Sequence, residues 1–255
     1  MRISDALHTG AADAGAGATS RRPRGAGARG GRPKAEQRKE SVQRLMDVAR
    51  REFIAKGYDA ATVEEIAASA GLTKGAVYFY FKSKANLLLS LLDEAERLTV
   101  EPAVAAVETA AAQGTARDQI VAFLHSQSLA GAEHADRMLL VILMSAELHG
   151  RGGELDTRLR SINDRMQQLL ARVVTDGKRA GEFTSDVPTA ELVSVILAVN
   201  QGCYLEWYRR RDELRGADLV RALRTVVLYG VLAQPAGAAE KTRARRDPAD
   251  NTGGL

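Results

Sequence analysis

The sequence predicts an all-α fold, with an N-terminal three-helix domain followed by a larger C-terminal helical bundle. Apolar residues recur at the i, i+3, i+4 and i+7 spacing of one helix face, and between residues 98 and 232 every convincing apolar segment has this period. Capping residues and glycines mark where the helices begin and end. A chain of 255 residues can bury roughly 70% of its unfolded surface, which is enough for one or two domains.

The first predicted helix spans residues 34–56. Its apolar stripe consists of Val42, Leu45, Met46, Ala49 and Phe53. Its basic residues off the stripe are Arg38, Lys39, Arg44, Arg50, Arg51 and Lys56. Gly57 ends the helix, because glycine adopts the left-handed conformation of a helix terminus without a steric penalty. The stripe must pack on the segment that follows, since two short helices cannot bury a core alone.

Two short helices follow, and their capping signals are local. Thr62 with Glu65 forms a capping box, so the second helix begins at residue 63, and Gly71 ends it. Thr73 caps a third helix that runs to about residue 80, and Leu72 before it can pack against residue 77 as a hydrophobic staple. Two helices joined by a tight glycine turn predict a helix-turn-helix.

The third helix presents groups that suit DNA. Lysines neutralise phosphates, amides at a helix N-terminus bind them, and tyrosine offers a stacking face with a hydroxyl donor. Gly75 permits close backbone approach to a duplex. The candidate DNA contacts of this region are Thr62, Thr73, Lys74, Gly75, Ala76, Tyr78, Tyr80, Lys82 and Lys84. The alternative is an ordinary helical hairpin whose tyrosines pack in a core. Ser83 then caps a fourth helix rich in leucine.

The run Thr-Val-Glu-Glu-Ile-Ala at 62–67 and the run Ala-Gly-Leu-Thr-Lys-Gly-Ala-Val-Tyr-Phe-Tyr-Phe-Lys-Ser-Lys at 70–84 resemble the signature of the TetR family of bacterial transcription regulators. The resemblance covers roughly residues 36–92. It implies an all-helical homodimer, with an N-terminal DNA-binding domain and a C-terminal domain that dimerises and holds a small effector. The expected function is a sequence-specific repressor that a small hydrophobic effector releases from a palindromic operator.

The resemblance also implies roles for individual residues. The positions that match family contacts to phosphate are Thr62, Thr73, Tyr78 and Lys84. The positions where the family approaches base edges or the DNA backbone are Lys74, Gly75 and Tyr80. One departure is visible, because Ala85 and Asn86 stand where the family often has an acidic residue.

Four segments follow from these patterns. They are a disordered basic arm at 1–33, the helix-turn-helix DNA-binding domain at 34–96, the effector-binding and dimerisation domain at 97–234, and a disordered tail at 235–255. Residues 1–34 hold seven basic and two acidic residues, a net +5, so the rest of the chain carries about −1 of the total +4. Arg29 and Arg32 resemble arginine arms that enter an A·T-rich minor groove, and a merely solvated tail is the alternative.

Several classes of protein are disfavoured. No run approaches the ~20 apolar residues that span a bilayer, and the apolar core of a signal peptide is absent. The one cysteine, Cys203, cannot form an internal disulfide and suits a reducing interior. We therefore expect a cytoplasmic protein associated with the bacterial nucleoid. Its expected partners are double-stranded DNA, a second copy and an unknown small effector, with no membrane and no cofactor.

Within the C-terminal domain, proline and glycine predict the helix boundaries. Pro102 should kink or break the fourth helix, whereas Gly114 and Gly131 should separate the helices that follow. A loop at 150–153 precedes a long helix to about residue 178. The last two helices, at about 189–210 and 217–232, are unusually apolar and predict a four-helix dimer interface. The residues expected to share one face of the first of these are Leu192, Val195, Ile196, Val199 and Cys203.

The effector candidates are amide, methionine and aromatic residues within the apolar helices: Phe123, Gln127, Met144, Asn163, Met166, Asn200, Tyr204 and Trp207. Each has a structural alternative, since methionine often fills core gaps and a tryptophan can bond its indole to a carbonyl under a dimer. Asn200 is the strongest candidate, because a buried amide needs hydrogen-bond partners that a ligand could supply. An apolar pocket with few polar anchors would suit a lipid-like or aromatic effector.

Two other functions stay open. One is a constitutive DNA-binding or architectural protein without ligand control. The other is an enzyme with its site in the C-terminal domain, where the histidines are His125, His134 and His149. The pattern disfavours the enzyme, because neither a His-Glu-x-x-His motif nor a nucleophile elbow occurs.

Overall fold

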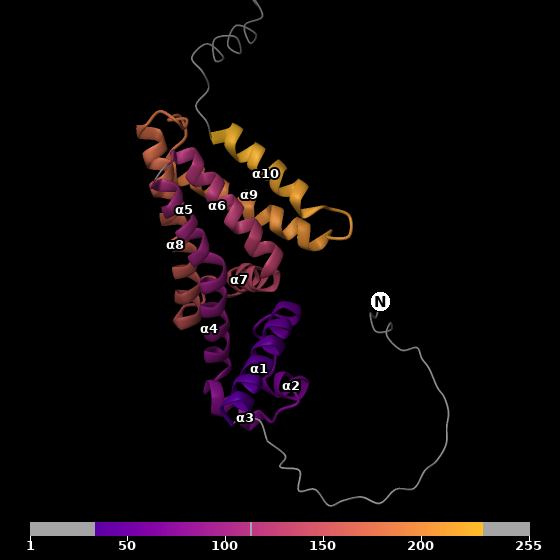
Figure 1. The fold of residues 1–255 in the computed structure, drawn as a ribbon. Helices are drawn as coiled ribbons and strands as arrows, with labels where there is room; N and C mark the ends of the chain where they lie inside the picture. Colours follow the sequence, from indigo (N-terminus) through magenta and orange to yellow (C-terminus); the bar gives the residue numbers. More distant parts are fainter. Residues whose placement is uncertain (1–33, 113, 232–255) are drawn as a thin grey trace, which may run out of the picture.

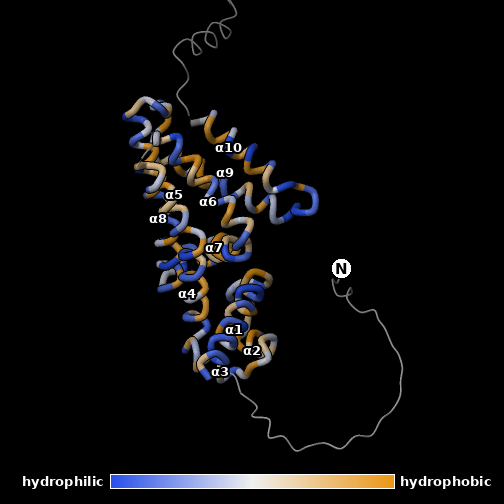
Figure 2. Tube along the Cα trace, viewed as in Figure 1, coloured by the Kyte–Doolittle hydropathy of each residue, from blue (hydrophilic) through white to orange (hydrophobic). Residues whose placement is uncertain are grey.

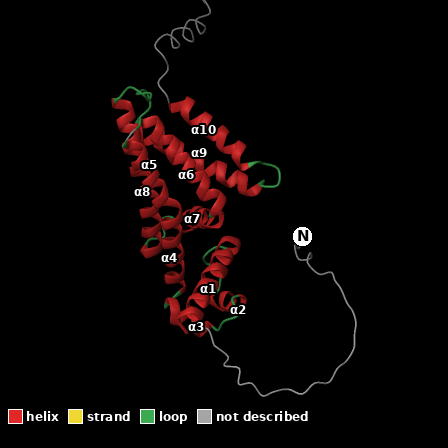
Figure 3. Ribbon diagram, viewed as in Figure 1, coloured by secondary structure: helices red, strands yellow, loops and turns green. Residues whose placement is uncertain are grey.

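The computed structural model describes residues 34–112 and 114–231. Every regular element in these ranges is a helix and none is a strand, as Figure 3 shows. The predicted all-α fold is therefore confirmed for this part of the chain. The predicted arm at 1–33, with Arg29 and Arg32, and the predicted tail at 235–255 lie outside the described residues.

The N-terminal domain consists of α1 (Lys34–Lys56), α2 (Val63–Ser69), α3 (Lys74–Phe81) and the start of α4 (Lys84–Ala95), at the lower end of the molecule in Figure 1. The predicted caps are confirmed. The Thr62 hydroxyl accepts from the backbone N–H of Glu65, and the Glu65 carboxylate accepts from the Thr62 N–H, which completes the capping box. Gly57 and Gly71 take positive φ angles of 83° and 67° where their helices end.

The core of this domain forms where the apolar stripe of α1 meets the inner faces of α2, α3 and α4. Its fully buried side chains include Leu45, Phe53, Ile66, Val77, Leu87 and Leu91. Figure 2 shows hydrophobic and hydrophilic residues alternating along these helices, as expected when one face of each is covered. Burial of this kind stabilises by about 1.5–3 kcal/mol per large side chain.

The connection between the domains runs without a loop. A π-helical turn, η1 (Glu96–Val100), joins α4 directly to α5 (Glu101–Ala111), and Pro102 lies in the first turn of α5. The sequence predicted a kink or break at Pro102. The structure instead absorbs the missing proline N–H in the wider turn that precedes it, because proline is tolerated in the first turn of a helix.

The C-terminal domain adds α6 (Ala116–Glu133), α7 (Ala135–Leu148), α8 (Gly153–Arg179), α9 (Thr189–Arg209) and α10 (Gly216–Val231). In Figure 1, α4, α5 and α8 form a long column, with α6, α9 and α10 beside its upper part and α7 lying between that part and α1. The loop between α9 and α10 is hydrophilic (Figure 2).

The expectation that Gly131 separates two helices is wrong. Gly131 is buried inside α6, and the chain breaks at His134, whose φ and ψ of −132° and 36° leave the helical region. A Cβ at residue 131 would lie 3.5 Å from the ring of Tyr204, an ordinary van der Waals contact, so α9 packs against α6 at this glycine without requiring it.

Arg50 joins the two domains. The sequence placed it off the apolar stripe of α1, yet the residue is only 4% exposed. Its guanidinium contacts Asp47 at 2.5 Å, Glu94 of α4 at 2.9 Å and Asp136 of α7 at 2.5 Å. At the other end of α7, the Glu147 carboxylate accepts from the backbone N–H of Tyr58 at 2.9 Å. Helix α7 therefore holds the DNA-binding domain at two points.

Candidate DNA-binding surface and ligand cavity

The N-terminus of α3 is open on its outer side. Thr73 caps it, with the hydroxyl accepting from the N–H of Ala76 at 3.2 Å. A Cβ at Gly75 would meet only the Thr73 hydroxyl, at 3.7 Å, and nothing from the rest of the described chain. A flat, side-chain-free patch of backbone with free helix-terminal amides is suited to a phosphate.

Lys74 and Tyr78 follow on the same exposed side. The Lys74 ammonium pairs with the Glu64 carboxylate of α2 and lies 5.8 Å from the centre of the Tyr78 ring. The hydrogen bond to Glu64 raises the pKa of Lys74. The ion pair links α2 to α3 at the surface.

Two surface residues of this region were not among the sequence candidates. Phe79 is 66% exposed on α3 and packs edge-on against Tyr80, with ring centres 5.1 Å apart. The Arg38 guanidinium of α1 lies 5.9 Å from both rings. The signal available in sequence was positional, since residues 77 and 81 face the core and residue 79 must then point away.

The two lysines beyond α3 differ in setting. Lys82 is exposed and ends the helix with φ of 69°, the one non-glycine positive φ of the described residues. Lys84 is half-buried: its ammonium donates to the Asp59 carbonyl at 3.3 Å and lies 4.4 Å above the Tyr58 ring. Lys84 therefore anchors the start of α4 to the turn after α1, besides being a candidate for phosphate contact.

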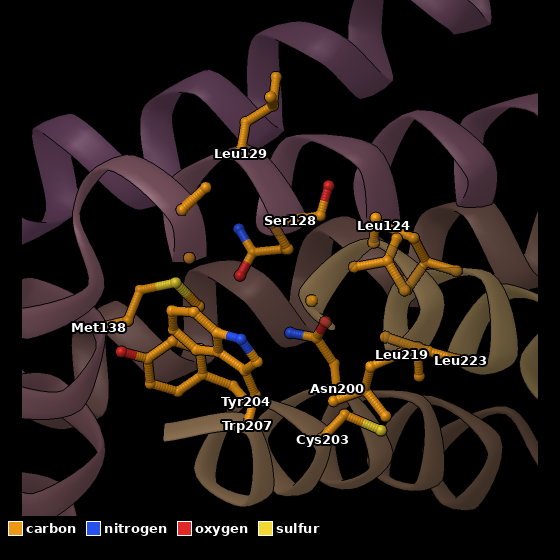
Figure 4. A pocket seen from close by; sticks show the side chains of 16 residues that line it. Leu124, Ser128, Leu129, Met138, Asn200, Cys203, Tyr204, Trp207, Leu219 and Leu223 are labelled. Carbon is orange, nitrogen blue, oxygen red and sulfur yellow. The ribbon is translucent and has the colours of Figure 1, made fainter. Parts of the chain in front are cut away.

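An apolar cavity of about 390 Å³ lies among α6, α7, α9 and α10. Residues lining this apolar cavity include Leu124, Gln127, Asn200, Tyr204, Trp207 and Leu223. No charged side chain occurs in its lining within the described residues. Figure 4 shows the Asn200 amide at its centre, with Tyr204 and Trp207 on one side and Leu219 and Leu223 on the other.

A second cavity of about 500 Å³ adjoins the first and is more polar. Residues lining this polar cavity include Thr99, Gln127, Arg160, Asn163, Met166 and Asn200. Gln127, Met138 and Asn200 line both cavities, so they stand at the junction. Asn163 donates from its side-chain amide to the Ser145 hydroxyl at 3.2 Å.

The structure thus brings six of the eight effector candidates to these cavities. Tyr204 and Trp207 line the apolar cavity, Asn163 and Met166 the polar cavity, and Gln127 and Asn200 line both. Phe123 and Met144 line neither and are buried in the main core. The Tyr204 hydroxyl donates to the Ala135 carbonyl at the start of α7, and burial raises the pKa of this tyrosine far above its ordinary value.

The outer face of α9 and α10 exposes large apolar side chains. Val195 is 57% exposed, Val226 62% and Tyr229 73%. Of the residues predicted to share one face of α9, Leu192 and Ile196 are buried whereas Val195 is exposed. At 100° per residue, Val195 lies roughly 130° from the middle of the buried stripe of α9, which consists of Leu192, Val193, Ile196, Asn200 and Tyr204.

Other site types find no support among the described residues. No group of three or more His, Cys, Asp or Glu side chains there could hold a metal ion. Within the same ranges, the helices are all too short or too polar to cross a membrane.

Known proteins resemble the chain over both domains. The family model for bacterial regulatory proteins, tetR family, matches residues 45–91, and the model for a tetracyclin repressor-like C-terminal domain matches residues 140–223. The transcriptional repressor BepR of Brucella suis biovar 1 (strain 1330) is 26% identical over 196 residues, which cover 74% of this chain and 90% of BepR. The crystal structure of the MbdR regulator from Azoarcus sp. CIB is 37% identical, with a TM-score of 0.67, and the match covers 76% of this chain and 100% of MbdR.

A helix-turn-helix mounted on a cavity-bearing helical bundle, together with these relatives, defines a DNA-binding transcriptional regulator. The chain belongs to the TetR family of bacterial regulatory proteins.

Proposed function

We propose that this regulator is a repressor which binds a palindromic operator as a homodimer and leaves it when a small hydrophobic effector fills the apolar cavity. The proposal rests on two features found in one chain: the N-terminus of α3 is open on its outer side, and an internal cavity is lined by uncharged residues. Helix α4 and η1 join the two directly. A bacterial cytoplasmic location, where the DNA lies, follows from the same proposal.

DNA contact is assigned to α3 and its flanks. Gly75 and the α3 N-terminus would approach the backbone, Tyr78 would reach into the groove with Lys74, and Lys82 would neutralise a phosphate. Tyr80 is half-buried against the core, so only the exposed part of its ring is available to DNA. Thr62 and Lys84 contribute at the edges, where both also hold the local fold. This assignment leaves the sequence candidates in place and adds Phe79 and Arg38.

The second copy is assigned to the outer face of α9 and α10. Exposed Val195, Val226 and Tyr229 form an apolar surface that a partner would cover, and a patch of this kind marks an interaction site. A twofold axis there would pair α9 and α10 with their counterparts in a four-helix contact. Two α3 helices would then meet successive turns of one duplex.

The effector is assigned to the apolar cavity. Two solved structures share this fold and contain acyl thioesters: AibR with isovaleryl coenzyme A and operator DNA, and FadR of Bacillus subtilis with stearoyl-CoA. They are 17% and 20% identical to this chain. Acyl-CoA esters are therefore the class we propose to test first, with the acyl chain in the apolar cavity and the polar part in the polar cavity.

The test has two stages. Sequencing the genomic fragments that the purified protein retains should yield a shared palindrome, and a set of fragments without a common motif would contradict the proposal. Anisotropy titrations of that operator with acyl-CoA esters of four to sixteen carbons should then show loss of affinity for at least one chain length. If neither the esters nor a cell extract changes the affinity, the constitutive DNA-binding alternative holds.

A further inference from the structure

Gln127 connects the cavities to the junction of the two domains. This α6 residue is 6% exposed and lines both cavities. Its side-chain amide donates to the Thr99 carbonyl of η1 at 2.9 Å. The π turn and Pro102 disturb the backbone hydrogen bonds of this segment, so a side-chain donor there stabilises a turn that is intrinsically weak.

The η1 turn connects the C-terminal domain to the DNA-binding domain. It continues α4, which packs on α1 and α3 in the DNA-binding domain. From α8, Arg165 holds the Glu96 side chain of η1 at 2.9 Å, away from the cavities. Thr99 and Val100 of η1 line the polar cavity themselves, and Gln127, which lines both cavities, holds this turn by a hydrogen bond.

Asn200 of α9 supplies a second amide at the same junction. It is 7% exposed, and its side-chain amide points into the apolar cavity (Figure 4). An amide that faces a cavity has donors and an acceptor to offer a ligand there. The apolar cavity offers no charged side chain to a carboxylate within the described residues, whereas a neutral carbonyl needs only N–H donors.

We propose that the effector is an apolar chain carrying a neutral carbonyl, as in a thioester, and that its oxygen takes hydrogen bonds from Gln127 and Asn200. Bonding to the ligand draws the Gln127 amide away from Thr99, so that η1 loses its side-chain support and α4 shifts the DNA-binding domain. This inference rests on the proposed function, since it names the chemistry by which the effector would release DNA.

The first experiment needs no ligand. Gln127→Leu removes the donor, Gln127→Glu keeps the size but cannot donate when ionised, and Gln168→Leu makes the same change at an exposed position of α8 that lines neither cavity. We expect both Gln127 variants to bind the operator about tenfold more weakly and to exchange the amide hydrogens of residues 100–105 faster. The Gln168 variant should stay within about twofold of the wild type. Circular dichroism melting confirms that each variant is folded. If both Gln127 variants bound the operator and exchanged their amide hydrogens as the wild type does, the Gln127–Thr99 hydrogen bond would have no role in DNA binding.

The second experiment uses decanoyl-CoA and S-decyl-CoA, a thioether that lacks only the carbonyl oxygen. The thioester should lower operator affinity of the wild type at least tenfold, the thioether should not, and Gln127→Leu should respond to neither. Equal release by the two compounds would overturn recognition of the carbonyl. If neither compound released the operator while the Gln127 variants still bound it weakly, the proposed effector class would be overturned. The role of the Gln127–Thr99 hydrogen bond in supporting η1 would remain.

Discussion

At the scale of single residues, Lys82 is the clearest sign that function competes with stability. A lysine at φ of 69° costs on the order of 1–3 kcal/mol, whereas glycine adopts this conformation freely. The residue ends α3, where a positive φ terminates a helix, and it is exposed. We propose that lysine rather than glycine occupies this position because its charge meets a phosphate.

Replacing Lys82 should separate the two effects. Lys82→Gly should raise the melting temperature and Lys82→Ala should leave it nearly unchanged, while both weaken binding to specific and random duplex alike. Each should reduce the slope of log affinity against log salt by about 0.9 per protomer, as loss of one phosphate contact does. Titrations at four salt concentrations measure this, and an unchanged slope would remove Lys82 from the interface.

Single residues were predictable from sequence when their partners were near in the chain. The caps at Thr62 and Thr73 bond to amides three residues away, so their role is visible locally. Arg50 was not predictable, because two of its carboxylate partners lie 44 and 86 residues away and reach it only through the fold. The candidate Asn200 was found for a physical reason, since an amide within an apolar run must be accommodated.

At the scale of elements, two glycines inside helices have opposite roles. Gly75 in α3 faces open space, where we propose that DNA approaches, whereas Gly177 in α8 lies under Phe183. Gly75→Ala should raise stability by up to about 1 kcal/mol through helix propensity and weaken operator binding, because the methyl group stands between the backbone and the duplex. Chemical denaturation and anisotropy measure the two quantities, and unchanged operator affinity would contradict close approach at residue 75.

Gly177→Ala is expected to destabilise the C-terminal domain. The new Cβ would lie 2.5 Å from the Phe183 Cε2 atom and 2.9 Å from the Ala116 Cβ, neither of which is free to move in the core. Overpacking of this kind costs about 1–3 kcal/mol, and urea denaturation measures it. Gly75→Ala serves as the matched control for the change in helix propensity. A Gly177 variant as stable as the wild type would show that Phe183 can repack.

Helix identity was predictable and helix junctions were less so. The period of the apolar residues set the ranges of α1, α8 and α9 to within a few residues. The junction at Gly131 was misplaced because a glycine that ends a helix and one that lies inside a helix look alike in sequence. The π turn at η1 has no local sequence signal beyond Pro102, and it depends on contacts from α6 and α8.

At the scale of the whole molecule, α7 links the cavity to the DNA-binding domain. Its first turn accepts the Tyr204 hydroxyl at Ala135 and presents Asp136 to Arg50. Burial alone would raise the pKa of Asp136, but the charge and hydrogen bond of Arg50 outweigh it, and the pKa is lowered. A carboxyl with a lowered folded-state pKa adds stability above its unfolded pKa of about 3.9, and this is lost as pH falls through the folded value.

Asp136→Asn should therefore destabilise the protein at neutral pH by about 1 kcal/mol, a value reduced from that of a buried pair because the side chain is 42% exposed. The difference from the wild type should begin to shrink only as pH falls below the unfolded pKa of about 3.9, and it should vanish below the lowered folded-state pKa, where the wild-type carboxyl is protonated. Urea denaturation from about pH 2 to pH 7 measures it, with exposed Asp212→Asn as the control. A difference that does not shrink at all over this range would show that packing, not charge, is responsible.

The central claim is that α3 enters the groove of a duplex and that a twofold partner, joined through α9 and α10, places a second α3 one helical turn away. Hydroxyl-radical footprinting of the wild type on its retained operator tests this most directly. Two protected half-sites should be centred about 34 Å apart on one face of the duplex, and protection at both should be weaker with Gly75→Ala. A single protected patch, or protection that the Gly75 variant leaves unchanged, would contradict it.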